Sequence, residues 1–227
     1  MLRTIVIILL GIILTSCAST KSTTTFKGEM PYVEGTPTHE LLKASTNYLN
    51  LNPSKIFKFI QVSTDEVFGS LGSKGVFNEN SQLSPRNPYS ATKAAADHLV
   101  FSWHNTYGLP TIISNCSNNF GPFQNNEKLI PKTVESIIKK EHIQIYGSGK
   151  NIRDWLYVKD HALGILELFT HGRIGERYCI GGGEELSNIQ LVNQICEIAD
   201  KVLNLECSSK NLINFIVDRP GHDLRYA

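Results

Sequence analysis

Short strand-like segments alternate with longer helical segments from about Thr38 to the end of this 227-residue chain. The first pair is a helical apolar pattern over 38–50 followed by a β-rich run over 56–63. Alternation of this kind favours parallel strands, because each helix carries the chain back to the start of the next strand. The pattern therefore predicts an α/β fold in which helices cover both faces of a parallel sheet.

The later segments continue the alternation. After a loop over 69–87, a helix is predicted from Pro88, a favoured first helical residue, to Tyr107, with Gly108 as its terminator. No internal repeat interrupts the pattern. The remaining segments are predicted strands over 109–117, 143–147 and 177–182, and predicted helices over 128–140, 158–171 and 188–203.

Composition excludes several classes of protein. With 41% hydrophobic and 19% charged residues, the chain has the makeup of one globular domain with a small appended lobe. Its net charge is +1 without a long charged run, which argues against a nucleic-acid groove or a polybasic membrane surface. The five cysteines form no CxxC motif, so we expect a reducing compartment and no zinc site.

The first 25 residues have a character of their own. One early arginine precedes an apolar run from Ile5 to Leu14, which is too short for a bilayer span of about 20 residues but suits a signal peptide. The letters LTSC around Cys17 resemble the lipobox of bacterial lipoproteins, in which the cysteine is lipidated. The alternatives are a chance apolar start and an upstream sequence fused to a broken gene. We expect a linker over 26–35 and the folded domain over 36–227.

Polar side chains follow two of the predicted strands. In parallel α/β sheets, ligands bind beyond the carboxyl ends of the strands, which makes the residues STDE (63–66) and SNN (117–119) site candidates. Asp65 and Glu66 can reach one substrate only if the backbone leaves the extended conformation there. Two carboxyls in different environments can then act as acid and as base. The alternative is a solvated acidic turn.

Tyr89 and Lys93 are four residues apart on the predicted helix and so share one face. A lysine ammonium near a phenol favours the phenolate, which could act as a general base. The alternative is a chance spacing, with Tyr89 half-buried and Lys93 solvated.

Three glycine-rich segments do not fit nucleotide-binding loops. The letters GSLGSKG (69–75) have the spacing of a dinucleotide-binding turn, but they lead into a segment that cannot form a helix. The letters YGSGKN fail as a phosphate-binding loop, because Gln144 and Asn151 stand where glycine and serine or threonine belong. The letters GGGEE (181–185) are predicted to be a strand-to-helix turn.

Two arginines stand in polar, turn-rich contexts. If Arg153 and Arg219 converged, their guanidinium groups would form a clamp for a diphosphate. The alternative pairs each arginine with its adjacent aspartate.

Six segments together resemble one family. The resemblance is to the dTDP-glucose 4,6-dehydratases, a branch of the extended short-chain dehydrogenase/reductases, and it runs from about residue 36 to Ala227. It implies a partial Rossmann-like parallel sheet with helices on both faces plus a small C-terminal substrate-binding lobe. The segments are STDEVFG, SPRNPYSATKAAADHLV, TYGLPTIISNCSNNFGP, EKLIP, IYGSGKNIRDWLYVKDHA and DRPGHDLRYA.

The resemblance implies an NAD-dependent lyase that converts dTDP-glucose to its 4-keto-6-deoxy product. Tyr89, with its pKa lowered by Lys93 and by the cofactor's charge, would take the proton of the 4-hydroxyl, while Thr64 binds that oxygen. Glu66 would then take the C5 proton, and Asp65 would protonate the departing 6-hydroxyl. NAD would contact Tyr89, Lys93 and Asn119.

The same resemblance assigns substrate contacts, a homodimer and a compartment. Asn118 would touch the diphosphate, and helices near 38–51 and 88–107 would form the homodimer. A cytoplasmic location is implied, which conflicts with lipidation at Cys17. Alternatives are a different nucleotide-sugar dehydratase or epimerase, and a non-enzymatic nucleotide-sugar-binding lipoprotein. The other expected substrate-binding residues are Lys128, Leu129, Tyr146, Arg153, Asn188, Arg219 and His222.

The sequence departs from the family at both ends. The family begins with a strand, a GxxGxxG turn and the first half of a Rossmann sheet, and it continues past Tyr226 and Ala227. We therefore expect a fragment that binds NAD weakly and does not turn over by itself.

Overall fold

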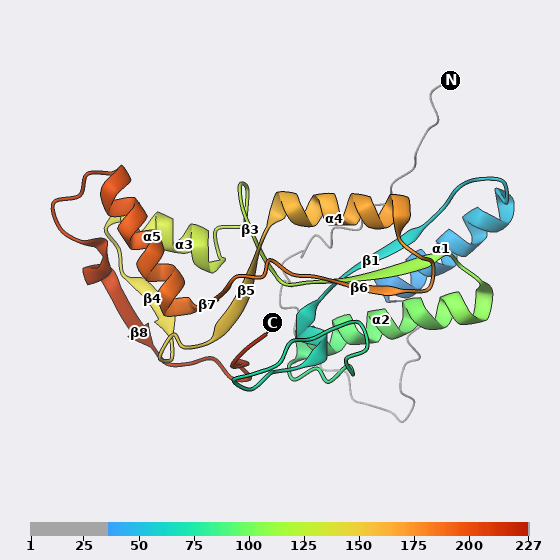
Figure 1. Ribbon diagram of the computed structural model, residues 1–227, viewed down its shortest axis with the longest axis horizontal. Helices are drawn as coiled ribbons and strands as arrows, with labels where there is room; N and C mark the ends of the chain where they lie inside the picture. Colours follow the sequence, from blue (N-terminus) through green and yellow to red (C-terminus); the bar gives the residue numbers. More distant parts are fainter. Residues whose placement is uncertain (1–35, 227) are drawn as a thin grey trace, which may run out of the picture.

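A computed structural model describes residues 36–226 of the chain. Three parallel strands, in the order β1-β2-β6, form the first sheet. Helix α4 lies on one face of this sheet, and α2 and α1 lie on the other (Figure 1). These elements are α1 (Pro37–Leu51), β1 (Phe59–Thr64), α2 (Pro88–Tyr107), β2 (Thr111–Cys116), α4 (Val158–His171) and β6 (Arg177–Ile180).

A second lobe lies at the opposite end of the molecule (Figure 1). It pairs β4 (Ile143–Tyr146) with β8 (Ile213–Ile216) in parallel and packs α3 (Leu129–Lys139) against α5 (Asn188–Val202). Between the lobes, β5 (Ile152–Tyr157) pairs in parallel with β3 (Asn118–Phe120) and antiparallel with β7 (Glu185–Ser187). The second lobe has its own core, made of Ile137, Ile143, Ile145, Val192 and Cys196.

The predicted class is confirmed, and each predicted helix is present with its ends within a residue or two. The sheet prediction was too simple. The described strands form three small sheets instead of one, and four short strands, β3, β5, β7 and β8, were not predicted. The GGGEE segment leads into β7 before the helix begins, so it is not a direct strand-to-helix turn.

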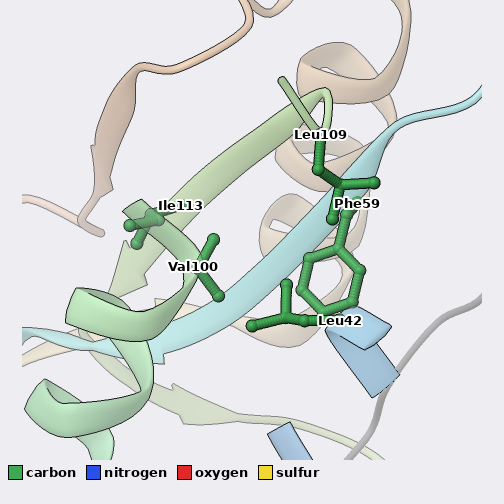
Figure 2. Close-up of a cluster of buried hydrophobic side chains, with 5 residues drawn as sticks. All are labelled: Leu42, Phe59, Val100, Leu109 and Ile113. Carbon is green, nitrogen blue, oxygen red and sulfur yellow. The ribbon is translucent and has the colours of Figure 1, made fainter. Parts of the chain in front are cut away.

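The core of the first lobe joins both helices of one face to the sheet. Figure 2 shows Leu42 of α1, Val100 of α2, Phe59 of β1 and Ile113 of β2 packed together with Leu109, which precedes β2. All five side chains are buried. This cluster fixes α2 beneath β1 and β2, because each fully buried side chain of this size stabilises the fold by about 1.5–3 kcal/mol.

Helix α2 has the start and stop signals that the sequence indicates. Asn87 caps its N-terminus by accepting a hydrogen bond from the Ser90 N–H at 2.9 Å, and Pro88 is the first helical residue. Gly108 ends the helix in the left-handed conformation, with φ of 66°. These signals place Tyr89 in the first turn, close to the end of β1.

The glycine-rich segment over 69–75 is a loop, and no helix begins between it and Pro88, as predicted. None of the helices described between residues 36 and 226 is long and apolar enough to cross a membrane. The signal-like interpretation of residues 1–25 and the linker over 26–35 lie outside the described residues.

Candidate active site

The chain turns sharply at the carboxyl end of β1. Asp65–Phe68 form a short 3-10 helix, and Thr64 caps it by accepting a hydrogen bond from the Glu66 N–H at 3.3 Å. The Thr64 hydroxyl donates to Asp65 Oδ1 at 3.1 Å. The backbone thus leaves the extended conformation where the sequence requires it to, and the two carboxyl groups follow one another around a turn.

Asp65 is held in an environment that favours its neutral form. Burial raises the pKa of its carboxyl to about 7, more than the Thr64 hydrogen bond and the nearby Arg153 lower it. Its Oδ2 atom is buried and has no hydrogen-bond partner. A carboxyl that stays protonated near neutral pH can serve as a general acid.

Glu66 lies between the cap of α2 and the C-terminal segment. Its Oε2 atom accepts from Asn87 Nδ2 at 3.4 Å and lies 3.5 Å from the Tyr226 hydroxyl oxygen. The single proton of that hydroxyl is donated in a short hydrogen bond to buried Asp223. Glu66 is therefore oriented by the cap of α2 and by the C-terminal segment, which Figure 1 shows returning to the middle of the molecule.

Tyr89 and Lys93 share a face of α2, but they do not interact in the expected way. Burial and the nearby Glu66 and Cys116 raise the pKa of Tyr89 to about 12, the opposite direction to the one expected. Lys93 is buried, and its Nζ donates to the Val62 carbonyl at 2.7 Å. Its ammonium thus reaches the backbone of β1 and not the Tyr89 phenol, which is 46% exposed.

The two asparagines after β2 lie on β3 beside this turn. Asn119 Nδ2 donates to Cys116 Sγ at 3.3 Å and to the Ser117 carbonyl at 3.1 Å. Its Oδ1 atom is buried without a partner. Asn118 is half-buried on the same short strand, which pairs with β5.

Arg153 lies on β5 and is 5% exposed. It donates to the carbonyls of Ile152 at 2.7 Å and Asp223 at 3.0 Å, and it stacks 4.3 Å from the centre of the Tyr226 ring. The pairing with Asp154 that we considered is absent, since the Asp154 carboxylate accepts from backbone N–H groups at 2.7 and 2.8 Å. The Arg153 side chain is thus fixed by backbone carbonyls.

Arg219 and His222 lie near Arg153. Positive charge on the two arginines contributes, after burial, to lowering the pKa of His222. Asp218 accepts from His222 Nδ1 at 2.7 Å and from the backbone N–H of Arg219 at 2.8 Å, so the Arg219 guanidinium is not its partner. The His222 ring meets Tyr146 edge to face at 6.5 Å. Four of the predicted substrate residues are thus gathered around one cationic cluster.

The remaining predicted residues stand at helix starts in the second lobe. Lys128 precedes α3, and its Nζ lies 3.4 Å from a carboxylate oxygen of Glu127. Leu129 packs against the second core, and Asn188 begins α5 and donates from its N–H to the Asn151 carbonyl at 3.0 Å. No direct contact joins these three residues to the turn after β1 in the described structure.

Three site residues were missed by the sequence analysis. Asn87 could have been found as the cap residue before Pro88. Tyr226 and Asp223 belong to the DRPGHDLRYA segment, which was noticed only for its arginine and histidine. The contact of Tyr226 with Glu66 joins residues that are 160 positions apart, and no local pattern predicts it.

Comparisons with known proteins fit this geometry. A family model described as GDP-mannose 4,6 dehydratase matches residues 28–227. The chain belongs to this family. Among its relatives, a probable dTDP-glucose 4,6-dehydratase of Sinorhizobium fredii is 49% identical over 193 residues, and dTDP-glucose 4,6-dehydratase 1 of Escherichia coli K12 is 45% identical over 202 residues. Each match covers 84% of this chain.

Solved structures of a dehydratase and of an epimerase have the same fold. A dTDP-glucose 4,6-dehydratase from Bacillus anthracis, in complex with NAD, is 43% identical, with a TM-score of 0.74 over 84% of this chain and 56% of that one. A UDP-glucuronic acid 4-epimerase from Bacillus cereus, in complex with UDP-glucuronic acid and NAD, is 25% identical, with a TM-score of 0.71 over 83% of this chain and 56% of that one. The chain spans about half the length of the curated relatives it matches.

Proposed function

We propose that this chain carries the substrate side of an NAD-dependent dTDP-glucose 4,6-dehydratase, a lyase. The observation that carries the proposal is the turn after β1, where a carboxyl with its pKa raised to about 7, Asp65, adjoins a second carboxyl, Glu66. Removal of water from a sugar needs one group that gives a proton and one that takes a proton. The names of the relatives favour this function over a non-enzymatic binding protein.

Three side chains fit the nicotinamide side of NAD. Asn119 offers a buried acceptor without a partner, which suits an amide donor such as the one on nicotinamide. Tyr89 and Lys93 lie on the helix beneath the same strand ends. When NAD is bound, it supplies transient removal and return of a hydride at the sugar.

The proposed proton transfers rest on the resemblance to the dehydratases. Tyr89 takes the proton of the sugar's 4-hydroxyl through its phenol oxygen, which requires that the Lys93 ammonium and bound NAD lower the phenol's pKa from its raised value in this structure. The Thr64 hydroxyl binds that same sugar oxygen. The Glu66 carboxylate takes the proton from C5, which is acidic once C4 is a ketone. Asp65 gives its proton to the departing 6-hydroxyl, so water leaves.

Binding of the nucleotide diphosphate is assigned to the cationic cluster. Arg219 lies close enough to Arg153 and to His222 to help lower the pKa of each, and two guanidinium groups beside a histidine ring suit phosphate oxygens. Asn118 would touch the same diphosphate. The other assigned contacts are Lys128, Leu129, Tyr146 and Asn188.

An epimerase is the second candidate, because a solved 4-epimerase shares the fold. An epimerase moves a hydride without losing water, so it needs no acid for a leaving hydroxyl. The Asp65 carboxyl, whose pKa burial raises to about 7, therefore favours the dehydratase.

A chimera tests the function. Residues 36–227 would replace the matched part of the Bacillus anthracis enzyme, and formation of the 4-keto-6-deoxy product from dTDP-glucose would be measured. We expect turnover, with transient NADH and little product in the Glu66→Gln variant. Simultaneous loss of NADH formation and product in Glu66→Gln would contradict the assigned roles. Calorimetry with dTDP-, UDP- and GDP-glucose would test the preference for the base.

We also propose a homodimer through α1 and α2. Several large apolar side chains of these helices are exposed, among them Leu51 at 82%, Phe101 at 52% and Tyr107 at 59%. Changing Phe101 to Asp should shift sedimentation from dimer to monomer. The proposed location is the cytoplasm, and a diacylglyceryl group on Cys17, detected by mass spectrometry, would contradict it.

A further inference from the structure

A fully buried carboxylate lies behind the candidate active site. Asp97 is on α2, one helical turn after Lys93, and is 0% exposed. Its Oδ2 atom accepts from Asn115 Nδ2 at 3.2 Å and lies 3.4 Å from Arg177 Nη1. Its Oδ1 atom accepts no hydrogen bond from the described residues. Removing a carboxylate from water is costly unless charges or donors around it compensate, and the proposed proton transfers use none of these three side chains.

The same three side chains join α2 to the turn after β1. Asn115 Nδ2 also donates to the Thr64 carbonyl at 2.9 Å. Arg177 Nη1 donates to Asn115 Oδ1 at 3.1 Å, and the guanidinium lies 5.4 Å from the centre of the Phe68 ring. Thr64 caps the 3-10 turn and Phe68 is its last residue. Asp97 is thus held by β2 and β6 through groups that also contact both ends of the turn.

Lys93 shares the buried face of α2 with Asp97 and has donors to spare. The two residues are four positions apart, so their side chains lie one above the other on the helix. An ammonium has three donors, and the only acceptor of Lys93 among the described residues is the Val62 carbonyl, at 2.7 Å. Burial lowers the pKa of Lys93, and the charge of Asp97 raises it. The carboxylate therefore favours the charged form of the lysine.

The surroundings of Asp97 favour its ionised form against the effect of burial. Burial raises the pKa of Asp97, and four neighbouring groups lower it. They are the Ser63 hydroxyl of β1, the Arg177 guanidinium of β6, the Asn115 amide of β2 and the Lys93 ammonium. Cys116 of β2 is the other titratable group that acts on Lys93. Of the other elements that pack against α2, the 3-10 turn acts on Tyr89 through Asp65 and Glu66, and α1 places His39 against Trp103.

We propose that Asp97 is a positioning residue of the candidate active site, and that it acts through Lys93 by keeping the ammonium charged and close to Tyr89. The proposal rests on the proposed function and adds to it the group that prepares Lys93. In that function Tyr89 gives up its proton only beside a charged ammonium. Coulomb attraction needs no hydrogen bond, so Asp97 acts on Lys93 whether the ammonium donates to Val62 or turns to Tyr89.

Titration of Lys93 in the 227-residue chain tests this charge relation without any turnover. With lysines labelled with carbon-13 at Cε, NMR follows each ammonium, and the Lys93 signal is the one that is absent from Lys93→Met. In Asp97→Asn, Lys93 should lose its proton at a pH about one unit or more below that of the unmodified chain. Asp97→Glu should restore most of this difference, because it keeps the charge.

Glu197→Gln is the matched control, since it removes an exposed carboxylate that pairs with Lys210 on another part of the surface. It should leave the titration of Lys93 unchanged. Identical titration of Lys93 in folded Asp97→Asn and in the unmodified chain would overturn the proposal.

Lys93→Met measures the same coupling from the other side, which keeps the test decisive if Asp97→Asn does not fold. Coupling between two sites is reciprocal, so loss of the ammonium should raise the pH at which Asp97 takes up a proton by a similar amount. The carbon-13 signal of the Asp97 carboxyl, assigned by its absence from Asp97→Glu, reports this change. An Asp97 titration that does not respond to Lys93→Met would also overturn the proposal.

The pH profile of kcat in the chimera with the Bacillus anthracis enzyme tests whether Asp97 acts through Lys93 on Tyr89. In Asp97→Asn the acidic limb, which reports ionisation of Tyr89, should move to higher pH, and kcat at neutral pH should fall on the order of tenfold. KM for dTDP-glucose should change little. A purely structural role would lower the amount of active enzyme and leave the acidic limb in place, and a direct effect of the Asp97 charge on Tyr89 would move the limb to lower pH. Either of these two results would overturn the proposal.

Failure of this proposal can be told apart from failure of the proposed function. A chimera that forms no product would contradict the proposed function, and the titrations of Lys93 and Asp97 would still decide whether the two groups are coupled. A chimera that turns over, with the same acidic limb in Asp97→Asn as in the unmodified protein, would overturn the role of Asp97 alone.

Discussion

Asp65 and Glu66 are neighbours in the chain, yet their carboxyl groups lie in different surroundings. Asp65 is buried and one of its oxygens has no partner, whereas Glu66 accepts a hydrogen bond from Asn87 and lies beside Tyr226. Burial raises the pKa of the Asp65 carboxyl, and the hydrogen bond from Thr64 offsets this only in part. The 3-10 turn therefore places two identical functional groups in different surroundings.

Asp65→Asn should make stability less dependent on pH. Below pH 4 the Asp65 carboxyl is protonated in both the folded and the unfolded chain. Because its pKa rises from 3.8 to about 7 on folding, the folded chain keeps a proton between these values that the unfolded chain has lost. Stability is thus lost as pH rises from about 4 to 7. At pH 8, Asp65→Asn should be more stable than the unmodified chain, by up to on the order of 4 kcal/mol.

Urea unfolding at pH 4.5 and pH 8 measures this difference. Thr64→Val serves as a control, because it removes the hydrogen bond to Asp65 without removing the buried carboxyl. A stability difference between Asp65→Asn and the unmodified chain that is the same at both pH values would mean that the Asp65 pKa is not raised on folding.

At the scale of elements, the residue that caps helix α2 also contacts a side chain of the candidate site. Asn87 accepts from Ser90 N–H and donates to Glu66, so one side chain holds both the helix start and a carboxylate. Asn87→Ala should lower the free energy of unfolding by about 1 kcal/mol. Asn87→Ser should keep most of that stability, since serine also caps helices, and should lose the contact with Glu66. Thermal melts of both variants check this, and equal losses would argue against the cap.

Arg225 joins the C-terminal segment to two distant elements. Its guanidinium binds both carboxylate oxygens of Glu185, at 2.6 and 2.7 Å, and donates to the Gly75 carbonyl at 2.9 Å. Arg225→Ala should destabilise the fold by about 1–3 kcal/mol, because charge-assisted hydrogen bonds are lost. Lys210→Met, which breaks an exposed pair with Glu197, is the control and should leave the urea midpoint unchanged. Equal midpoints for both variants would contradict the role of Arg225.

The sequence predicted the long elements well because their signals are local. Apolar periodicity, Pro88 and Gly108 suffice to define α2, and the position of Asp65 and Glu66 past a strand suffices to expect a turn. Strand β5 could not be predicted in this way. Its buried charges, Arg153 and Asp154, find their partners in backbone groups 28 to 70 residues away. The direction of the Tyr89 pKa likewise depends on burial by distant segments.

At the scale of the whole molecule, the site draws on both lobes and on the segment between them. Thr64 and Tyr89 belong to the first lobe, Tyr146 to the second, and Arg153 to the central strand β5. The C-terminal segment connects them, since Leu71 N–H donates to the Arg225 carbonyl at 2.9 Å and Tyr226 reaches Glu66. In the proposed function, substrate groups held in one lobe would thus meet proton-transfer groups held in the other.

We predict that the 227-residue polypeptide expressed alone binds NAD weakly and does not form product. A dinucleotide's pyrophosphate is held where a strand leads through a glycine-rich turn into a helix N-terminus. In the described part of the chain, Gly181–Gly183 lead from β6 into the strand β7, and the glycines of 69–75 lead into a loop. If the proposed function holds, Tyr89, Lys93 and Asn119 would hold only the nicotinamide side of NAD.

Poor positioning of the NAD nicotinamide against the sugar is enough to prevent turnover. A displacement of about 1 Å between reacting groups can lower the rate on the order of a hundredfold. Calorimetric titration with NAD and an assay for the 4-keto-6-deoxy product test this prediction, with the chimera on the Bacillus anthracis enzyme as the positive control. If the purified polypeptide alone converted dTDP-glucose at a rate near that of the chimera, the pyrophosphate would have to be held by residues other than a glycine-rich turn, and the prediction would be wrong.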